Sequence, residues 1–162
     1  MISAFPLTVV IVSILVGKYS NLISSRELSV LGMSIVAIAL LLMSRITLYS
    51  SILFIETSLI ILGIGLSLFA APNTNANLSS VAPDQRSLAN GMLGTMRHMG
   101  QSLSLAIGAS VVGIFLSADI YNVGGSVSAA QYVQGLSQSF LIGALVAIVG
   151  IFVALIRGKD NI

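Results

Sequence analysis

Polar side chains interrupt a long apolar stretch in the segment GTMRHMGQSLSLAIG, residues 94–108. Arg97, His98 and Gln101 lie within five positions of one another there. A guanidinium inside a membrane costs from roughly 3 to more than 10 kcal/mol, depending on the measure. Arg97 is therefore expected to line a water-filled cavity or to pair with another charge. If its helix begins well inside the cytoplasm, the alternative is that Arg97 extends its head to the lipid headgroups.

Helical spacing divides this segment into two faces, because residues three or four positions apart lie on the same side of a helix. The polar face comprises Gly94, Arg97, Gln101, Ser104 and Gly108, and the apolar face comprises Met96, Met99, Leu103 and Ile107. We expect the polar face to turn toward protein or a water-filled cavity and the apolar face toward lipid. Gly100, Ser104 and Gly108 also form a small-residue ladder that allows another helix to approach closely. His98 points about 100° away from Arg97, which favours packing or hydrogen bonding over proton transfer.

Glu56 is a second charge inside an apolar stretch, SSILFIETSLIILG. It lies about 10 Å from the outer end of its predicted span at 1.5 Å per residue. A carboxyl group there would be partly desolvated, and it could carry a proton through a conformational cycle. The alternative is an interfacial glutamate whose head reaches the outer water near Arg45. Further small-residue ladders are expected to serve packing alone: Gly63, Ser67 and Ala71, and then Gly143 and Ala147.

The composition indicates the class of protein that must position these groups. Only 7% of the residues are charged and 56% are apolar, whereas soluble domains carry about 25% charged residues. The expected fold is an all-α polytopic bundle in the lipid bilayer. The basic residues are few and scattered, so nucleic acid is not an expected partner. With one histidine, no cysteine and neither a metalloprotease nor a serine-hydrolase motif, the sequence predicts no enzyme, metal site or cofactor.

A membrane span needs about 20 mostly apolar residues. Within one membrane domain, the sequence predicts five spans, at residues 2–17, 28–44, 49–71, 88–117 and 137–156. The first is short, and the fourth is so long that its first turns should extend into water. Pro72 is expected to bend or end the third span. Residues 119–134, with a Gly-Gly pair and several serines, are expected to form a flexible connector.

The distribution of lysine and arginine predicts the orientation. One side of the membrane would carry Lys18, Arg26, Arg86, Arg157 and Lys159. Only Arg45 would lie on the other side. The expected arrangement is a multi-pass plasma-membrane protein with a cytoplasmic C-terminus. An odd number of spans places the two termini on opposite sides.

Residues 72–108 resemble the penultimate helix, with its preceding loop, of transporters in the major facilitator superfamily. The likeness is greatest to the fourteen-helix drug:proton antiporter branch and is carried by Pro72, Asn75, Pro83, Arg86, Gly91, Arg97 and Gly100. The stretch GKYSNLISSR resembles the cytoplasmic loop of the same superfamily through Gly17, Lys18 and Arg26. In that loop Asn21 stands where an aspartate is usual.

The resemblance aligns the five spans with the last five helices of such a transporter. It implies alternating access and export of amphipathic compounds driven by proton entry. One incomplete half cannot enclose the central cavity of such a protein. The sequence therefore predicts a fragment of a proton-coupled multidrug efflux antiporter, inactive alone, whose partner is the missing transporter half. The alternatives are a small oligomerising membrane scaffold or assembly subunit, and a piece of a solute:cation symporter of the same superfamily.

Overall fold

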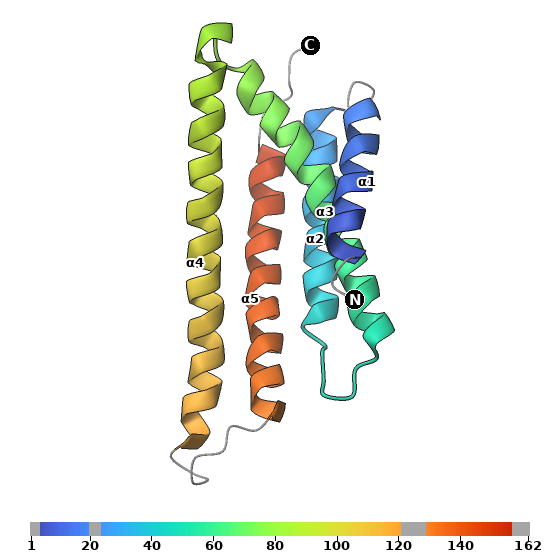
Figure 1. Cartoon of the computed structure of the whole chain (residues 1–162), viewed down its shortest axis with the longest axis vertical. Coiled ribbons are helices and arrows are strands. Elements are labelled where there is room, and N and C mark those ends of the chain that lie inside the picture. Colours follow the sequence, from blue (N-terminus) through green and yellow to red (C-terminus); the bar gives the residue numbers. More distant parts are fainter. Residues whose placement is uncertain (1–3, 20–23, 121–128, 157–162) are drawn as a thin grey trace.

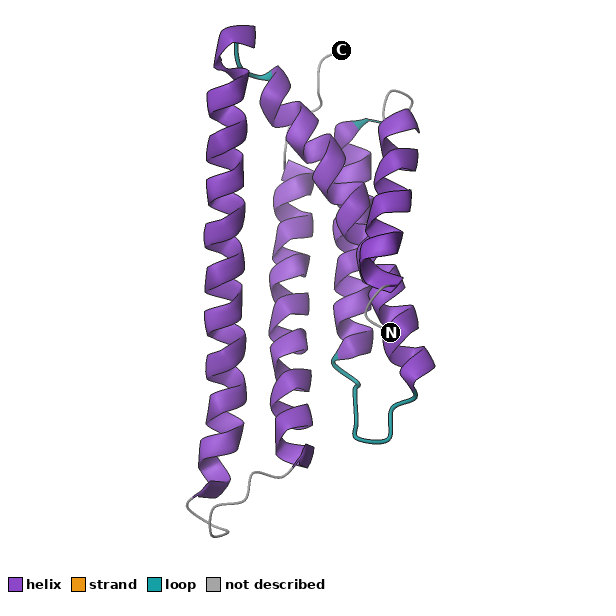
Figure 2. Ribbon diagram, in the orientation of Figure 1, coloured by secondary structure: helices purple, strands orange, loops and turns teal. Residues whose placement is uncertain are grey.

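The computed structural model describes residues 4–19, 24–120 and 129–156. Its helices are α1 (Ala4–Tyr19), α2 (Ser25–Met43), α3 (Ile52–Ser79), α4 (Arg86–Ile120) and α5 (Ala129–Ile156), with a 3-10 turn η1 (Pro83–Gln85) before α4. Every regular element in these ranges is helical (Figure 2). The expected all-α bundle is confirmed.

Helix length separates α1 from the other four helices. Within the described ranges, α2, α3, α4 and α5 are each long and apolar enough to cross a membrane. The 16 residues of α1 rise only about 24 Å at 1.5 Å per residue, less than the ~30 Å hydrocarbon core. Among the described residues, the first apolar helix is thus shorter than a complete span, in agreement with the expectation for this segment. The 35 residues of α4 rise about 52 Å, so part of this helix must extend beyond the hydrocarbon core.

Two helices extend beyond the spans predicted within them. Pro72 is expected to bend or end the third helix, but the helix does not end there and continues to Ser79. Pro72 is fully buried, and packing around its ring outweighs the loss of one backbone donor. The fifth helix begins at Ala129, eight residues before its predicted start, so residues 129–134 are helical and not a connector. Residues 121–128, with the Gly-Gly pair of the predicted connector, lie outside the described residues.

Successive helices run in opposite directions, so each loop lies at one of two ends of the bundle (Figure 1). We call the end that holds residue 19, residue 24 and the α3–α4 turn the basic end. Lys18, Arg26 and Arg86 all lie there, and Arg45 lies at the opposite end. This grouping of the described basic residues agrees with the split on which the predicted orientation depends. Arg157 and Lys159 are outside the described residues.

The centre of the bundle is where α2 meets α3 and α5. Val36, Ala37 and Ala147 form its buried apolar cluster. At the crossing of α2 and α3, a Cβ atom added to Gly32 would lie 2.6 Å from the backbone nitrogen of Phe69 and 2.8 Å from the carbonyl oxygen of Gly65. The two backbones are therefore in direct contact, as is typical of membrane helices that associate through small residues.

The two small-residue ladders predicted for packing also lie at helix interfaces. In α3, the Ser67 hydroxyl donates to the Val9 carbonyl of α1 over 3.2 Å. In α5, a Cβ atom added to Gly143 would lie 3.5 Å from Leu40 of α2, and Ala147 belongs to the central cluster. Both ladders bring a neighbouring helix close, as expected.

Hydrogen bonds join α2 to α5 near both ends. The Arg26 guanidinium donates to the Leu155 carbonyl at the basic end. The Ser137 hydroxyl donates to the Ser44 carbonyl at the opposite end. Together with the central cluster, these contacts hold α2 and α5 together along their length, while, among the described helices, α1 packs against α3 alone.

Candidate functional site

The first two thirds of α4 lie away from the other helices, apart from a contact of Arg97 with α3. The contacts of α4 with α5 lie in the C-terminal part of α4. There the Ser139 hydroxyl of α5 donates to the Gly108 carbonyl over 3.3 Å, and Gly135 of α5 approaches Val112. None of the residues Pro83–Leu116 is buried, whereas 39% of the spanning residues of α2 are. The part of α4 that carries the polar face is thus the least covered segment of the described bundle.

Arg97 has one hydrogen-bond partner among the described residues. Its Nη2 donates to the Oγ1 of Thr74 in α3 over 3.5 Å, and the Thr74 hydroxyl donates in turn to the Ala70 carbonyl over 2.8 Å. Thr74 belongs to the polar stretch of α3 that follows Ala71, where the predicted apolar span ends. The contact therefore places Arg97 level with the polar end of α3, near the basic end of the bundle.

Gln101 and His98 are paired with each other. The Oε1 of Gln101 and the Nδ1 of His98 are 3.1 Å apart, and both side chains are exposed. Because a carbonyl oxygen only accepts, the imidazole donates this hydrogen bond from Nδ1. The hydrogen-bonding role expected for His98 is present, and it places the Gln101 amide beside the imidazole.

The small-residue ladder on α4 is unoccupied in the described part of the chain. A Cβ atom added at Gly94, Gly100 or Gly108 would meet no atom within 4 Å. Ladders of this kind allow close helix packing, but among the described helices only α5 reaches this one, at the Gly108 carbonyl. Beside Arg97 there is consequently an open strip made of small residues.

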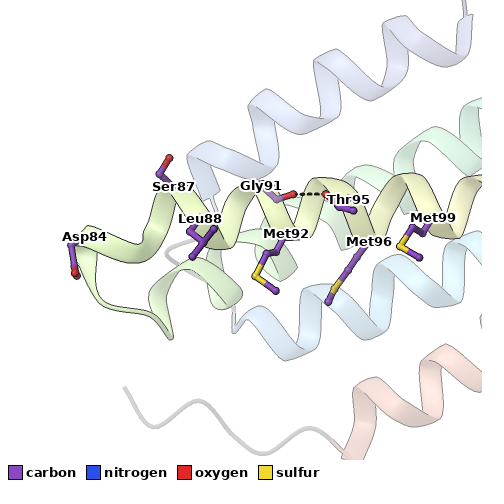
Figure 3. Close-up of a pocket in the computed structure, with 8 residues that line it drawn as sticks. All are labelled: Asp84, Ser87, Leu88, Gly91, Met92, Thr95, Met96 and Met99. Carbon is purple, nitrogen blue, oxygen red and sulfur yellow. Dashed lines mark hydrogen bonds between the residues drawn. The ribbon is translucent and has the colours of Figure 1, made fainter.

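The methionines lie on another side of α4. An open groove of about 860 Å³ follows the helix and is lined by Asp84, Ser87, Leu88, Gly91, Met92, Thr95, Met96 and Met99 (Figure 3). All of these residues belong to α4 and the turn before it, so the groove is one helix surface and not an enclosed cavity. Met96 and Met99 are 63% and 68% exposed. Since α4 contacts α3 and α5 through Arg97, Gly108 and Val112, helical spacing turns the methionines away from the bundle.

Glu56 is far from Arg97. It is half-buried in the second turn of α3, shortly after the capping residue Ser51. The 18 residues between Glu56 and Thr74 correspond to about 27 Å along the helix. The described structure therefore does not bring these two candidates together.

The loop-motif residues are distributed over three helices at the basic end. Gly17 and Lys18 lie in the last turn of α1, and Arg86 is the exposed first residue of α4. Arg26 lies in the first turn of α2, where its guanidinium binds a carbonyl of the last turn of α5. Cations are favoured at a helix C-terminus, so Arg26 contributes to packing. This packing role of Arg26 could not be predicted from the sequence, because Leu155 lies 129 residues away along the chain.

In the described ranges, no group of three or more His, Cys, Asp or Glu side chains could hold a metal ion. The groups that remain available at the candidate site are a guanidinium, an amide, an imidazole and thioethers. They can bind an anion, donate hydrogen bonds and contact apolar surface.

Comparison with known proteins places this geometry in context. No family profile and no solved structure matches the chain. The chain is 28% identical over 115 residues to the "Uncharacterized transporter YebQ" of Escherichia coli (strain K12). The match covers 71% of this chain and 25% of that protein, so the chain spans about a quarter of its relative's length. Together with the apolar helices of spanning length, this similarity supports a multi-pass, transporter-like membrane protein.

Proposed function

We propose that the chain is one portion of a proton-coupled multidrug efflux antiporter of the major facilitator superfamily, in the plasma membrane with its C-terminus in the cytoplasm. In this proposal the chain does not transport alone. The similarity to a transporter about four times as long as the matched segment supports it, as does the alternation of five helices.

The observation that carries the proposal is the exposure of the polar face of α4. Arg97, His98 and Gln101 are all exposed within a helix that is apolar enough to span a membrane. Polar and charged groups in contact with acyl chains are costly and usually face a bundle interior or a water-filled cavity. A further set of helices would remove that cost by enclosing a cavity along this face. Arg97, level with Thr74, would then lie at the inner mouth of the cavity.

Within the same proposal, Glu56 is the proton-carrying group. It lies at the end of the bundle opposite Arg97, so it would exchange protons with the outer side. The loop-motif residues at the basic end would face the cytoplasm, in agreement with the preference of lysine and arginine for that side.

The test begins with the genomic DNA on both sides of the reading frame. The proposal expects the remaining helices to be encoded in the same frame or an adjacent one.

The chain alone and the complete set of helices are then expressed in an exporter-deficient bacterium, and efflux of a panel of fluorescent amphiphiles is followed under a proton gradient. Efflux is expected only from the complete set, and Arg97→Ala should abolish it at unchanged expression. Met99→Ala, on the opposite face of the same helix, serves as the matched control. Efflux by the chain alone, or by the Arg97→Ala protein, would contradict the proposal.

A scaffold that self-associates is the second candidate function, and the unoccupied ladder of α4 favours it. Gly100 and Gly108 leave room for a close helix, which a second copy of the chain could supply. The molar mass of the purified chain in detergent separates the two functions. A stable oligomer that Gly100→Leu dissociates, with no further helices encoded nearby, supports the scaffold.

A further inference from the structure

We propose that the polar face of α4 around Arg97 binds the anionic group of an amphipathic molecule, so that organic anions with an apolar body are the preferred class of ligand. The inference rests on the proposed function only in assigning this ligand as a substrate. The binding site itself is argued from charge, space and depth.

Charge is the first argument. Within the described ranges, the only interaction of the Arg97 side chain is with the Thr74 hydroxyl. The nearest preceding carboxylate in the chain is Asp84, 13 residues or about 20 Å earlier along the axis. Glu27 lies in the first turn of α2 and Glu56 in the second turn of α3. Among the described side chains, Arg97 thus has no carboxylate paired with it, and its guanidinium presents donors that match an oxyanion.

Space is the second argument. Gly94 and Gly100, three positions before and after Arg97, carry no side chain, and an added Cβ atom at each would meet nothing within 4 Å. Gly108, about two turns further along the helix, also leaves room for a Cβ atom, while its carbonyl accepts a hydrogen bond from Ser139 of α5. A flat surface of small residues next to a planar cation suits an apolar or aromatic body, which can also stack on the guanidinium.

The level of Arg97 along the membrane normal determines the orientation of the ligand. Thr74 marks the polar end of α3, and Arg97 lies level with it. An amphiphile whose charged group lies at that level can extend its apolar body along α4 toward Gly108 and the middle of the bilayer. A cationic amphiphile in the same position would place like charges together, which disfavours its binding.

The test uses two hydrophobic ions of nearly equal size and opposite sign, tetraphenylborate and tetraphenylphosphonium. The full chain is placed in phosphatidylcholine nanodiscs, and binding in excess of empty nanodiscs is measured. Tetraphenylborate is expected to bind more tightly than tetraphenylphosphonium. One basic side chain near the membrane surface contributes about 1 kcal/mol to attraction of an anion, so Arg97→Gln should weaken tetraphenylborate binding about fivefold.

Two further variants keep the result interpretable. Arg97→Lys retains the charge and should retain most of the binding, which separates loss of charge from loss of folding. Arg86→Gln removes an exposed arginine of the same helix about 16 Å away, beyond the ~8 Å Debye length at physiological ionic strength. It should change binding less than twofold.

Phosphatidylglycerol in the nanodiscs distinguishes the source of the anion. If this lipid weakens tetraphenylborate binding in the native protein but not in Arg97→Gln, the anionic headgroup of a lipid occupies the site. If it has no such effect, the site takes a freely diffusing amphiphile. Both results support an anion site at Arg97.

Equal binding of the two ions, or equal effects of Arg97→Gln and Arg86→Gln, would overturn the inference. Binding that depends on Arg97 in a chain without further encoded helices would retain the site and reject the transporter.

Discussion

Replacing Gly32 by alanine tests the packing of the bundle most sharply. A Cβ atom at this position would lie 2.6 Å from the Phe69 nitrogen and 2.8 Å from the Gly65 oxygen. Carbon atoms pack best at about 3.5–4.0 Å, so the new methyl group falls about 0.9 Å short of an ordinary contact. Both obstructing atoms belong to the backbone of α3, and neither can move without shifting that helix. We therefore expect Gly32→Ala to push α2 and α3 apart.

The magnitude follows from two opposing effects. Overpacking a well-filled interface costs about 1–3 kcal/mol, and contact with two backbone atoms of α3 indicates the upper value. Alanine gains up to about 1 kcal/mol over glycine in helix propensity. The net expected loss is about 2 kcal/mol of unfolding free energy. Gly100→Ala is the matched control, because its Cβ atom would meet nothing within 4 Å. Propensity alone then predicts a gain of up to about 1 kcal/mol.

The assay is unfolding of the purified chain in mixed micelles, in which the fraction of folded protein is followed against the mole fraction of sodium dodecyl sulfate. Gly32→Ala should unfold at a lower mole fraction than the native protein, and Gly100→Ala at the same or a higher one. If the two variants unfold at the same point, α2 and α3 do not cross in backbone contact at Gly32, and the reasoning fails.

Three further predictions concern single polar groups. Arg26→Gln should lower the unfolding free energy by about 1 kcal/mol, because it removes a charged hydrogen bond to the last turn of α5. Arg45→Gln, at the opposite end of the bundle, should change the unfolding free energy by less than about 0.5 kcal/mol. Equal effects of the two variants in the micelle assay would show that Arg26 has no packing role. Ser137→Ala should cost about 0.6 kcal/mol, the average for a hydrogen bond between membrane helices, and an unchanged unfolding curve would show that this bond contributes nothing. Glu56→Gln in the complete set of helices should abolish the dependence of efflux on the proton gradient, and an unaltered response to external pH would eliminate Glu56 as the proton site.

The helical class and the grouping of charges were predictable because both depend on simple averages. The low charge content excludes a soluble globule, and the distribution of lysine and arginine separates the two ends of the bundle. Small residues four positions apart also indicated true interfaces, as Ser67 and Gly143 show.

Long-range packing decided the features that the sequence did not indicate. Polar composition after Pro72 is typical of a loop, yet burial of the proline keeps α3 helical to Ser79. The start of α5 also has loop-like composition, but Gly135 packs against Val112 of α4, a partner that no local pattern identifies. At the candidate site, helical spacing placed Arg97 and Gln101 on one face; the partner of Gln101 is its near neighbour His98, whereas the partner of Arg97, Thr74, is brought near only by the fold.

The central claim is that the Arg97 face of α4 looks away from the acyl chains. The chain contains no cysteine, so single cysteines can be introduced without background at Gln101 on the polar face and at Met99 on the apolar face. In the complete set of helices, spin labels at the two positions are compared in a bilayer by their collision rates with a water-soluble nickel complex and with oxygen dissolved in lipid. The account predicts that the label at position 101 meets the nickel complex and the label at position 99 meets oxygen. A label at position 101 that collides with oxygen alone would contradict it.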